Sequence, residues 1–382
     1  MFTVLDIVDL HNGSMPSQSR PTPRFDWFVP IDGDGAHIGT VRAERPPTFE
    51  YLKQVVQTAE DNGYYSLLIP TRFANGLFEE TAPLAETWTT ATALAAVTSR
   101  IRFLIAVRPG FISPGMWGQM ASALSNISGG RIDVNIVPGG IQGDFERLGV
   151  HSDHDQRYAL ATEFIEASKL LWSAPEPVDY DGEVIKLEQA MVSPSPVGDG
   201  PRWYVGGASD NALDLAGSQA DNLLMWIQPL DAIAGLMERA RSRFEVNSRP
   251  PEFGLRTHII VRDTEQEAWD AAEDLLSKAQ IVVEQQRQTS FAGTAMVGQV
   301  AQSRSYEEHR VGDRLWNGIS TVRVNCGTAI VGNPQQVADE LMAYWRLGID
   351  EFILSGYPHV EEAQRVAQTV LPRVREAADS ER

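Results

Sequence analysis

Positively charged and ring-bearing side chains interrupt the most apolar segments in the C-terminal half of the chain. Five of them stand in or just beyond predicted strands: Arg256, His258, Arg323, Tyr357 and His359. A charged side chain is costly to bury unless an opposite charge meets it. Arginine presents a planar fork of N–H groups that matches a sulfonate, phosphate or carboxylate. We therefore expect these residues to line one pocket that holds an anion.

Two plainer explanations compete with an anion pocket. Each residue alone would ordinarily pair with a structural carboxylate, and the chain has 51 acidic residues to offer. Five residues at comparable positions are harder to explain in that way, even in a chain of formal net charge −19. A metal site is the weaker alternative, because no His-x-x-His or carboxylate pair has suitable spacing and adjacent arginines would repel a cation. We expect no bound metal.

A glycine-rich turn, Gly206-Gly207-Ala208-Ser209, follows one predicted strand and precedes a helix. Such a turn can bring backbone N–H groups, a serine hydroxyl and a helix N-terminus to a phosphate. His154 and Tyr158, which open another predicted helix, could reach the same phosphate. The alternatives remain open at this point: Ser209 or Asp210 as a simple N-cap, and His154 with Tyr158 as a surface cluster in a first helical turn.

Further candidates lie at other strand ends. Asn135 and Val137 end the fourth predicted strand, and the ends of barrel strands face the active-site mouth. The Asn135 amide could hydrogen-bond the edge of a heterocycle, with a satisfied core residue as the alternative. Trp27 and Trp203 are expected in the core, whereas Trp226, close to a strand end, is expected at the pocket.

Composition excludes several classes of protein. Hydrophobic content of 43% and charged content of 22% are ordinary for a soluble globular protein. The single cysteine, Cys326, rules out an internal disulfide and a cysteine metal cluster. No segment approaches the roughly 18–20 apolar residues of a membrane span, and early acidic residues argue against a signal peptide. A pI near 4.8 disfavours a nucleic-acid partner. We expect a cytoplasmic protein.

Strand-like and helix-like segments alternate along the chain. Eight strands are predicted: 25–30, 65–70, 102–107, 131–137, 203–205, 222–227, 253–262 and 351–354. Since each precedes a helix, the last over Glu361–Ala377, we predict an α/β protein folded as a closed TIM (β/α)8 barrel. No Gly-x-Gly-x-x-Gly follows the first strand to favour a dinucleotide-binding sheet.

The domain organisation follows from that barrel. Residues 1–23 are expected as an N-terminal extension, and 24–382 as one barrel. Residues 280–320 lose the strand–helix rhythm, so we predict an insertion there. This segment, with Arg310 and Arg314, could close over the site as a lid.

With these motifs in place, the chain resembles the bacterial-luciferase-like superfamily and, within it, the flavin-dependent alkanesulfonate monooxygenases. The similarity runs from about Phe25 to Arg373. Its most specific segments are 32–35 (DGDG), 38–40 (IGT), 67–71 (LLIPT), 204–207 (YVGG), 256–262 (RTHIIVR), 315–318 (LWNG), 327–332 (GTAIVG) and 355–359 (SGYPH).

The resemblance implies an enzyme that uses reduced FMN (FMNH2) and O2 to oxygenate the carbon bearing a sulfonate, so that an organosulfonate yields sulfite and an aldehyde. A separate NAD(P)H-dependent FMN reductase would supply the flavin, and a homodimer or homotetramer is expected. The implied catalytic residues are Arg256, His258, Arg323, Tyr357 and His359, with Trp226 added for substrate binding. The implied FMN-binding residues are Ala106, Asn135, Val137, His154, Tyr158, Gly207 and Ser209. We expect neighbouring arginines to lower the pKa of Tyr357, making it the proton donor or base.

One loop departs from the family pattern. After Leu67–Thr71 the family usually continues Gly-Arg-Ser-Cys-Glu-Asp, whereas this chain runs through Arg72–Thr81, longer and without cysteine. Because this loop should border the pocket, we expect a polar sulfonate such as the sulfosugar sulfoquinovose. Two alternatives stay open: a related flavin monooxygenase acting on a sulfone or heterocycle, and an F420- or flavin-binding relative without sulfonate chemistry.

Overall fold

The computed structural model describes residues 20–139, 142–151, 153–283, 285 and 309–382. Within these residues, eight parallel strands form a closed barrel: β1 (Arg24–Phe28), β2 (Ser66–Ile69), β3 (Arg102–Val107), β4 (Ile132–Ile136), β7 (Trp203–Gly206), β8 (Asn222–Trp226), β9 (Glu252–Val261) and β12 (Glu351–Ser355). The ring closes because β12 pairs with both β9 and β1. The predicted TIM barrel is confirmed, and every predicted strand coincides with a barrel strand.

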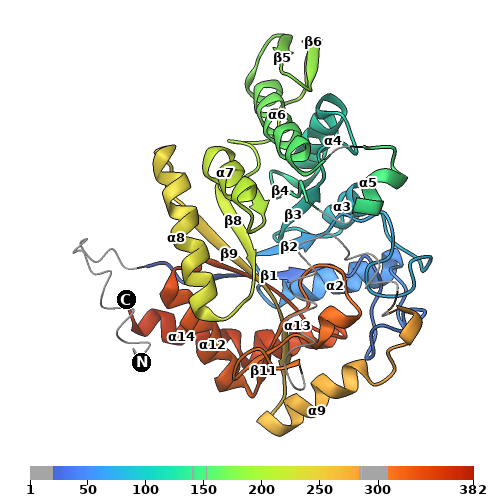
Figure 1. The fold of residues 1–382 in the computed structure, drawn as a ribbon, viewed down its shortest axis with the longest axis vertical. Coiled ribbons are helices and arrows are strands. Elements are labelled where there is room, and N and C mark those ends of the chain that lie inside the picture. Colours follow the sequence, from blue (N-terminus) through green and yellow to red (C-terminus); the bar gives the residue numbers. More distant parts are fainter. Residues whose placement is uncertain (1–19, 140–141, 152, 284, 286–308) are drawn as a thin grey trace.

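Helices surround the barrel (Figure 1): α2 (Phe49–Asp61), α3 (Thr87–Ala95), α4 (Pro114–Ser128), α5 (Gln142–Arg147), α6 (His154–Ser173), α7 (Asp210–Gln219), α8 (Leu230–Val246), α9 (Glu265–Leu276), α12 (Pro334–Leu347), α13 (His359–Thr369) and α14 (Leu371–Ser380). Asp153, Thr264 and Asn333 each form a capping box at a helix start. The single helix predicted over Glu361–Ala377 is wrong. It is α13 followed by α14, because Pro372 cannot continue the hydrogen-bond ladder of α13.

The two-residue alternation of the strands sorts side chains between the outside and the inside of the barrel. Outward residues pack against the helices in one large apolar core. Inward residues at the amino-terminal end form a polar floor: Arg24, Asp26, Ser66, Arg102, Asp133, Asn222, Glu252 and Glu351. Above it lies an apolar middle layer of Phe28, Leu68, Leu104, Tyr204, Leu224 and Ile353. The carboxyl-terminal end therefore holds a separate set of inward residues.

Short elements occur outside the predicted pattern. β11 (Ala329–Gly332) pairs with the second half of β9, and β10 (Leu315–Trp316) pairs antiparallel with β11. β5 (Val178–Asp181) and β6 (Lys186–Ala190) form a hairpin beyond the end of α6, at the top of Figure 1.

The predicted lid and extension lie partly outside the described residues, since 284, 286–308 and 1–19 are not among them. Of the lid residues that are described, Arg310 stacks on Trp269 of α9 at 3.8 Å and Arg314 lies 3.9 Å from Glu265 of the same helix. Both arginines therefore contact an outer helix. Among the described helices, none is both long and apolar enough to cross a bilayer.

Candidate active site

The five residues expected to share an anion pocket lie together at the carboxyl-terminal end of the barrel. Arg256 and His258 come from β9, Tyr357 from the turn after β12, and His359 from the first position of α13. The His258 and Tyr357 rings stack with centroids 5.6 Å apart, and Tyr357 meets His359 edge-on at 5.2 Å. Arg323 Nη1 donates a 2.7 Å hydrogen bond to the Tyr357 hydroxyl. Three separate segments thus build one cluster.

The sequence interpretation of Arg323 needs one correction. Arg323 does not follow a strand. It lies in the loop after the 3-10 helix Gly318–Thr321, and its backbone N–H donates to Ile319. The β-branched residues around it made the segment look like a strand, but that short helix turns the side chain into the pocket instead.

Arg256 and Arg323 are buried without a counter-ion. They are 3% and 2% exposed, and none of the described carboxylates pairs with either. Arg256 donates to the backbone oxygens of Thr257 and Ile353 and to Ser355 Oγ, whereas Arg323 Nε has no partner among the described residues. Burial, and then the charge of Arg323, lowers the pKa of Arg256 to about 10. A pocket with two such cations is complementary to an anion.

The histidines in this cluster are neutral, contrary to the cationic role expected from the sequence. Burial, reinforced by the two arginines, holds the pKa of both His258 and His359 well below the ordinary histidine value. The pKa of Tyr357 is raised to about 12, because burial outweighs the opposing effect of the arginines. The expected lowering of the Tyr357 pKa is therefore wrong, and the pocket's positive charge belongs to its arginines.

Sequence reasoning missed two further buried arginines beside this cluster. Arg72, after β2, pairs with Asp32 at 3.2 Å and donates to the backbone oxygen of Val324, next to Arg323. Arg108, after β3, pairs with Asp144 at 3.3 Å, and burial lowers its pKa to about 10. Arg108 follows an apolar strand directly and Arg72 follows one by three residues, so a cation near a strand end was a signal available for both.

The residues expected at an FMN phosphate also lie together. The Tyr158 hydroxyl is 3.4 Å from Ser209 Oγ, and the His154 and Tyr158 rings are 4.9 Å apart. Ser209 is the N-cap of α7, accepting from Ala212 N–H, as the plainer interpretation had it. Gly207 lies beside Tyr158: a Cβ on Gly207 would be 3.8 Å from that hydroxyl and 2.6 Å from Ala212 Cβ. A helix N-terminus, two hydroxyls and an exposed imidazole therefore meet at one turn.

The residues expected near the flavin ring sit on neighbouring strands. Ala106 and Asn135 are register partners, and Val137 N–H donates to Val107. Asn135 is 5% exposed, and its Oδ1 has no hydrogen-bond partner among the described residues, which argues against a satisfied core amide. Trp226, half-buried at the end of β8, is the register partner of Arg256. Trp27 and Trp203 are buried in the core, as expected.

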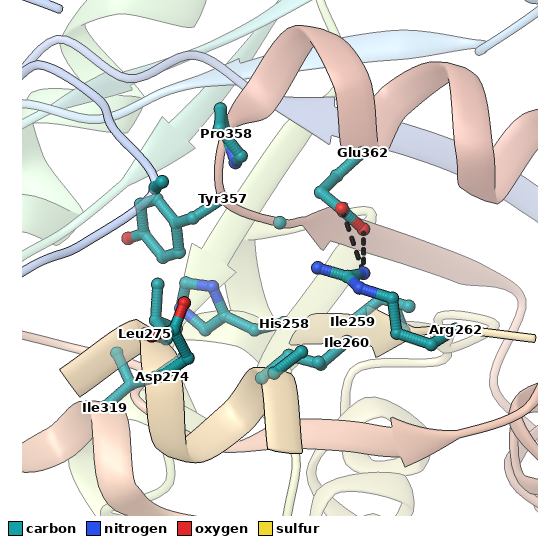
Figure 2. Close-up of a pocket in the computed structure, with 13 residues that line it drawn as sticks. His258, Ile259, Ile260, Arg262, Asp274, Leu275, Ile319, Tyr357, Pro358 and Glu362 are labelled. Atoms are coloured by element: carbon teal, nitrogen blue, oxygen red, sulfur yellow. Dashed lines mark hydrogen bonds and ion pairs between the residues drawn. The ribbon is translucent and has the colours of Figure 1, made fainter. Parts of the chain in front are cut away.

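Two hollows lie near the carboxyl-terminal end of the barrel, and one of them borders the cluster. A cavity of about 100 Å³ is lined by His258 and Tyr357, with the Arg262–Glu362 ion pair on another side (Figure 2). A larger hollow of about 490 Å³ is lined by Asp32, Arg42, Ala43, Pro46, Pro47, Glu79, Thr81, Ala82 and Pro83. Its volume falls in the range usual for small-molecule pockets, and through Asp32 it reaches the Arg72 ion pair.

Comparison with known proteins identifies solved structures that share this fold and a family whose sequence pattern the chain matches. Riboflavin lyase, solved with modified FMN and riboflavin, has a TM-score of 0.76 at 18% identity over 94% of this chain and 92% of that one. A long-chain alkane monooxygenase has a TM-score of 0.75 at 17% sequence identity, over 94% of this chain and 92% of that one. The EDTA monooxygenase of Chelativorans sp. BNC1 has a TM-score of 0.71 at 17% identity, over 94% of each chain. At these identities the structures establish a shared fold. Residues 23–351 match the family described as luciferase-like monooxygenase. The chain therefore belongs to the luciferase-like monooxygenase family.

Proposed function

We propose that this protein is an FMNH2- and O2-dependent monooxygenase that desulfonates an organosulfonate, releasing sulfite and an aldehyde. The observation that carries the proposal is the pair of buried arginines, Arg256 and Arg323, without a carboxylate partner. A sulfonate head supplies the missing negative charge and accepts several N–H groups at once. A neutral substrate would leave two buried cations uncompensated.

The second group of residues fits FMN. The turn at Gly207 and Ser209, with Tyr158 and His154, offers donors to a phosphate at the N-terminus of α7. The unpaired Asn135 Oδ1 can accept from a ring N–H. Reduced FMN, when bound, supplies the electrons that activate O2. The residues of the chain bind and orient the substrate, and the Tyr357 hydroxyl holds its proton at neutral pH.

The loop after β2 supports a polar substrate. Arg72 and Asn75 lie in the loop that departs from the family pattern, and both donate hydrogen bonds to Asp32, which lines the larger hollow. Carboxylate and amide groups recognise hydroxyls, which a sulfosugar such as sulfoquinovose carries. The function also requires O2, a separate NAD(P)H-dependent FMN reductase and, by analogy with the family, assembly as a homodimer or homotetramer.

The test is sulfite release across a panel of sulfonates with a supplied FMN reductase. We expect turnover with a polar sulfonate, and a fall of about 100-fold or more in Arg256→Ala with FMN affinity unchanged. Arg346→Ala, which breaks an exposed pair with Glu381, is the control. Sulfite release retained in Arg256→Ala would refute the anion-binding role. Oxidation of a sulfone or heterocycle without sulfite, or reduction of F420 in place of FMN, would identify the alternative enzymes.

A further inference from the structure

Ser355, the last residue of β12, lies between Arg256 and His258 and is fully buried. Arg256 Nη2 donates to Ser355 Oγ at 2.8 Å, and His258 Nδ1 lies 2.7 Å from the same oxygen. The strand register holds this arrangement, because Ser355 is the partner of His258 across the β9–β12 ladder. One hydroxyl therefore joins the cation to the imidazole.

The direction of each hydrogen bond follows from what each group can do. The backbone oxygen of Cys326 can only accept, so His258 Nε2, 3.0 Å away, carries a proton. The neutral imidazole has one N–H, so Nδ1 is a lone pair that accepts. The guanidinium of Arg256 can only donate, so Ser355 accepts from it and directs its own hydroxyl hydrogen at His258. Each hydrogen bond from Arg256 through Ser355 and His258 to Cys326 therefore joins one donor to one acceptor.

The same bonds determine which part of Arg256 remains available. Of the five guanidinium N–H groups, both on Nη1 go to Thr257 and Ile353, and one on Nη2 goes to Ser355. Within the part of the chain that the structure describes, the Nε–H and one Nη2–H have no protein partner and are left for a ligand. Bidentate binding of an oxyanion needs two such groups held in a fixed plane.

We propose that Ser355 is a positioning residue, which fixes the Arg256 fork for the substrate anion and holds His258 in its Nε2–H form. The identity of that anion rests on the proposed sulfonate function, whereas the hydrogen-bond chain does not. His258, with both nitrogens engaged, then serves as a rigid support for Tyr357 and does not exchange protons with the substrate.

The protonation pattern can be read by NMR on the full chain labelled with 15N-histidine. There are seven histidines, so His258→Gln identifies the signals of His258. We expect wild-type His258 to show a protonated Nε2 and a hydrogen-bonded, unprotonated Nδ1. In Ser355→Ala, the Nδ1 signal should move to the position of a free lone pair. Ser168→Ala, which removes another buried hydroxyl far along α6, should leave it unchanged.

A second measurement uses sulfite as the anion probe, by calorimetry on the protein without FMN. Ser355→Ala should bind sulfite about ten-fold or more weakly, the cost of one hydrogen bond to a charged group, and Ser168→Ala as tightly as wild type. A protonated Nδ1 in wild-type His258 overturns the proposal, and that result needs no variant to fold. The proposal is also overturned if Ser355→Ala changes neither the Nδ1 signal of His258 nor the affinity for sulfite. If sulfite fails to bind the wild type while the Nδ1 shift occurs, the sulfonate function fails and the Ser355 chain stands.

Discussion

Phe28 forms an aromatic surface against which both pocket arginines lie. The guanidinium carbons of Arg256 and Arg323 are 4.6 Å and 5.0 Å from its ring centroid. Such contacts stabilise a cation by about 0.5–2 kcal/mol, whereas desolvating an ion costs several kcal/mol. The ring alone therefore does not compensate two charges. Arg72 and Arg108 each have a carboxylate partner, whereas at Arg256 and Arg323 the proposed function assigns the missing negative charge to the substrate.

The Tyr357 hydroxyl is the hydrogen-bond acceptor that holds Arg323. We expect Tyr357→Phe to lower kcat/KM for the sulfonate about ten-fold, since the buried acceptor of a hydrogen bond from the charged Arg323 is lost. Because the pKa of Tyr357 is about 12, its phenol stays protonated from about pH 6 to about pH 10, and both proteins should share one pH profile there.

Tyr344→Phe is the matched control for that experiment. Tyr344 is also buried, and its hydroxyl donates to the backbone oxygen of Gln228, outside the pocket. An alkaline decline of activity in the wild type that disappears in Tyr357→Phe would show that Tyr357 ionises in this range and contradict the expectation.

The sequence predicts which residues gather at the pocket better than it predicts their charge. Arg256 stands out because a cation inside an apolar strand is rare. The neutrality of His258 and His359 is not visible locally, since it depends on burial and on arginines brought from other segments. Arg72 carried the same strand-end signal, but its partner Asp32 is forty residues away and no local pattern joins the two.

The loop after β2 fixes the loop that carries Arg323. Arg72 donates to the backbone oxygen of Val324 at 3.2 Å, and Val324 N–H donates to Gly76 at 2.9 Å. Asn325, with its amide oxygen toward Arg72, accepts from it at 3.1 and 3.3 Å. The position of Arg323 thus depends on a loop more than 240 residues earlier in the chain.

Arg72→Gln should therefore have two separable effects. It leaves Asp32 buried and unpaired, so we expect a loss of about 3–5 kcal/mol in the free energy of urea unfolding. It should also weaken sulfonate binding. The double variant Asp32→Asn/Arg72→Gln should recover most of the stability but not the affinity. Recovery of both would show that the loop contributes stability only.

The β7–α7 turn has no room for a side chain at Gly207. A Cβ there would lie 2.6 Å from Ala212 Cβ, so Gly207→Ala must shift the turn. We expect FMN affinity to fall at least ten-fold by fluorescence titration, and stability to fall by about 1–3 kcal/mol. Gly235→Ala in α8, where a Cβ meets open space, should bind FMN normally. Equal affinities in the two variants would remove the turn from the FMN site.

Element prediction succeeded where length and periodicity were clear. The barrel strands are apolar runs bounded by helices, which is the pattern of a buried parallel sheet. β11 is apolar and buried but has only four residues, and the β5–β6 hairpin is mostly exposed and has no apolar pattern. Both depend on tertiary contacts that the sequence does not display.

At the scale of the whole molecule, the first and last strand–helix units are joined directly. Asp34, in the loop after β1, accepts hydrogen bonds from Tyr51, from Gly35 N–H and from the His359 N–H at the start of α13. The Arg45–Glu361 pair crosses the same boundary at 2.7 Å. These contacts close the ring between the two ends of the sequence.

The free energy of unfolding should depend on pH through Asp34, which joins the first and last strand–helix units. Burial raises its pKa from 3.8 to about 7, despite the opposing effects of Tyr51, His359 N–H, Gly35 N–H and Arg45. The folded protein holds this proton more tightly than the unfolded chain, so the stabilisation is full below about pH 4 and is lost as pH rises to about 7. Each pKa unit is worth about 1.4 kcal/mol.

Asp34→Asn, which cannot ionise, isolates this effect. We expect the wild type to lose a few kcal/mol relative to the variant between about pH 4 and about pH 7, measured as the free energy of urea unfolding at several pH values. If the free energy of unfolding changes with pH in the same way in both proteins, Asp34 is ionised in the folded state throughout this pH range.

β9 is ten residues long and runs from the polar floor to the pocket. Glu252 at its start and Arg256 and His258 in its middle all face inward because they are spaced by even numbers. Deleting one residue from this strand would turn both pocket residues to the outer face. Deleting two would restore their direction but draw them about 7 Å deeper. Evolutionary changes of pocket depth along this strand are therefore confined to indels of residue pairs.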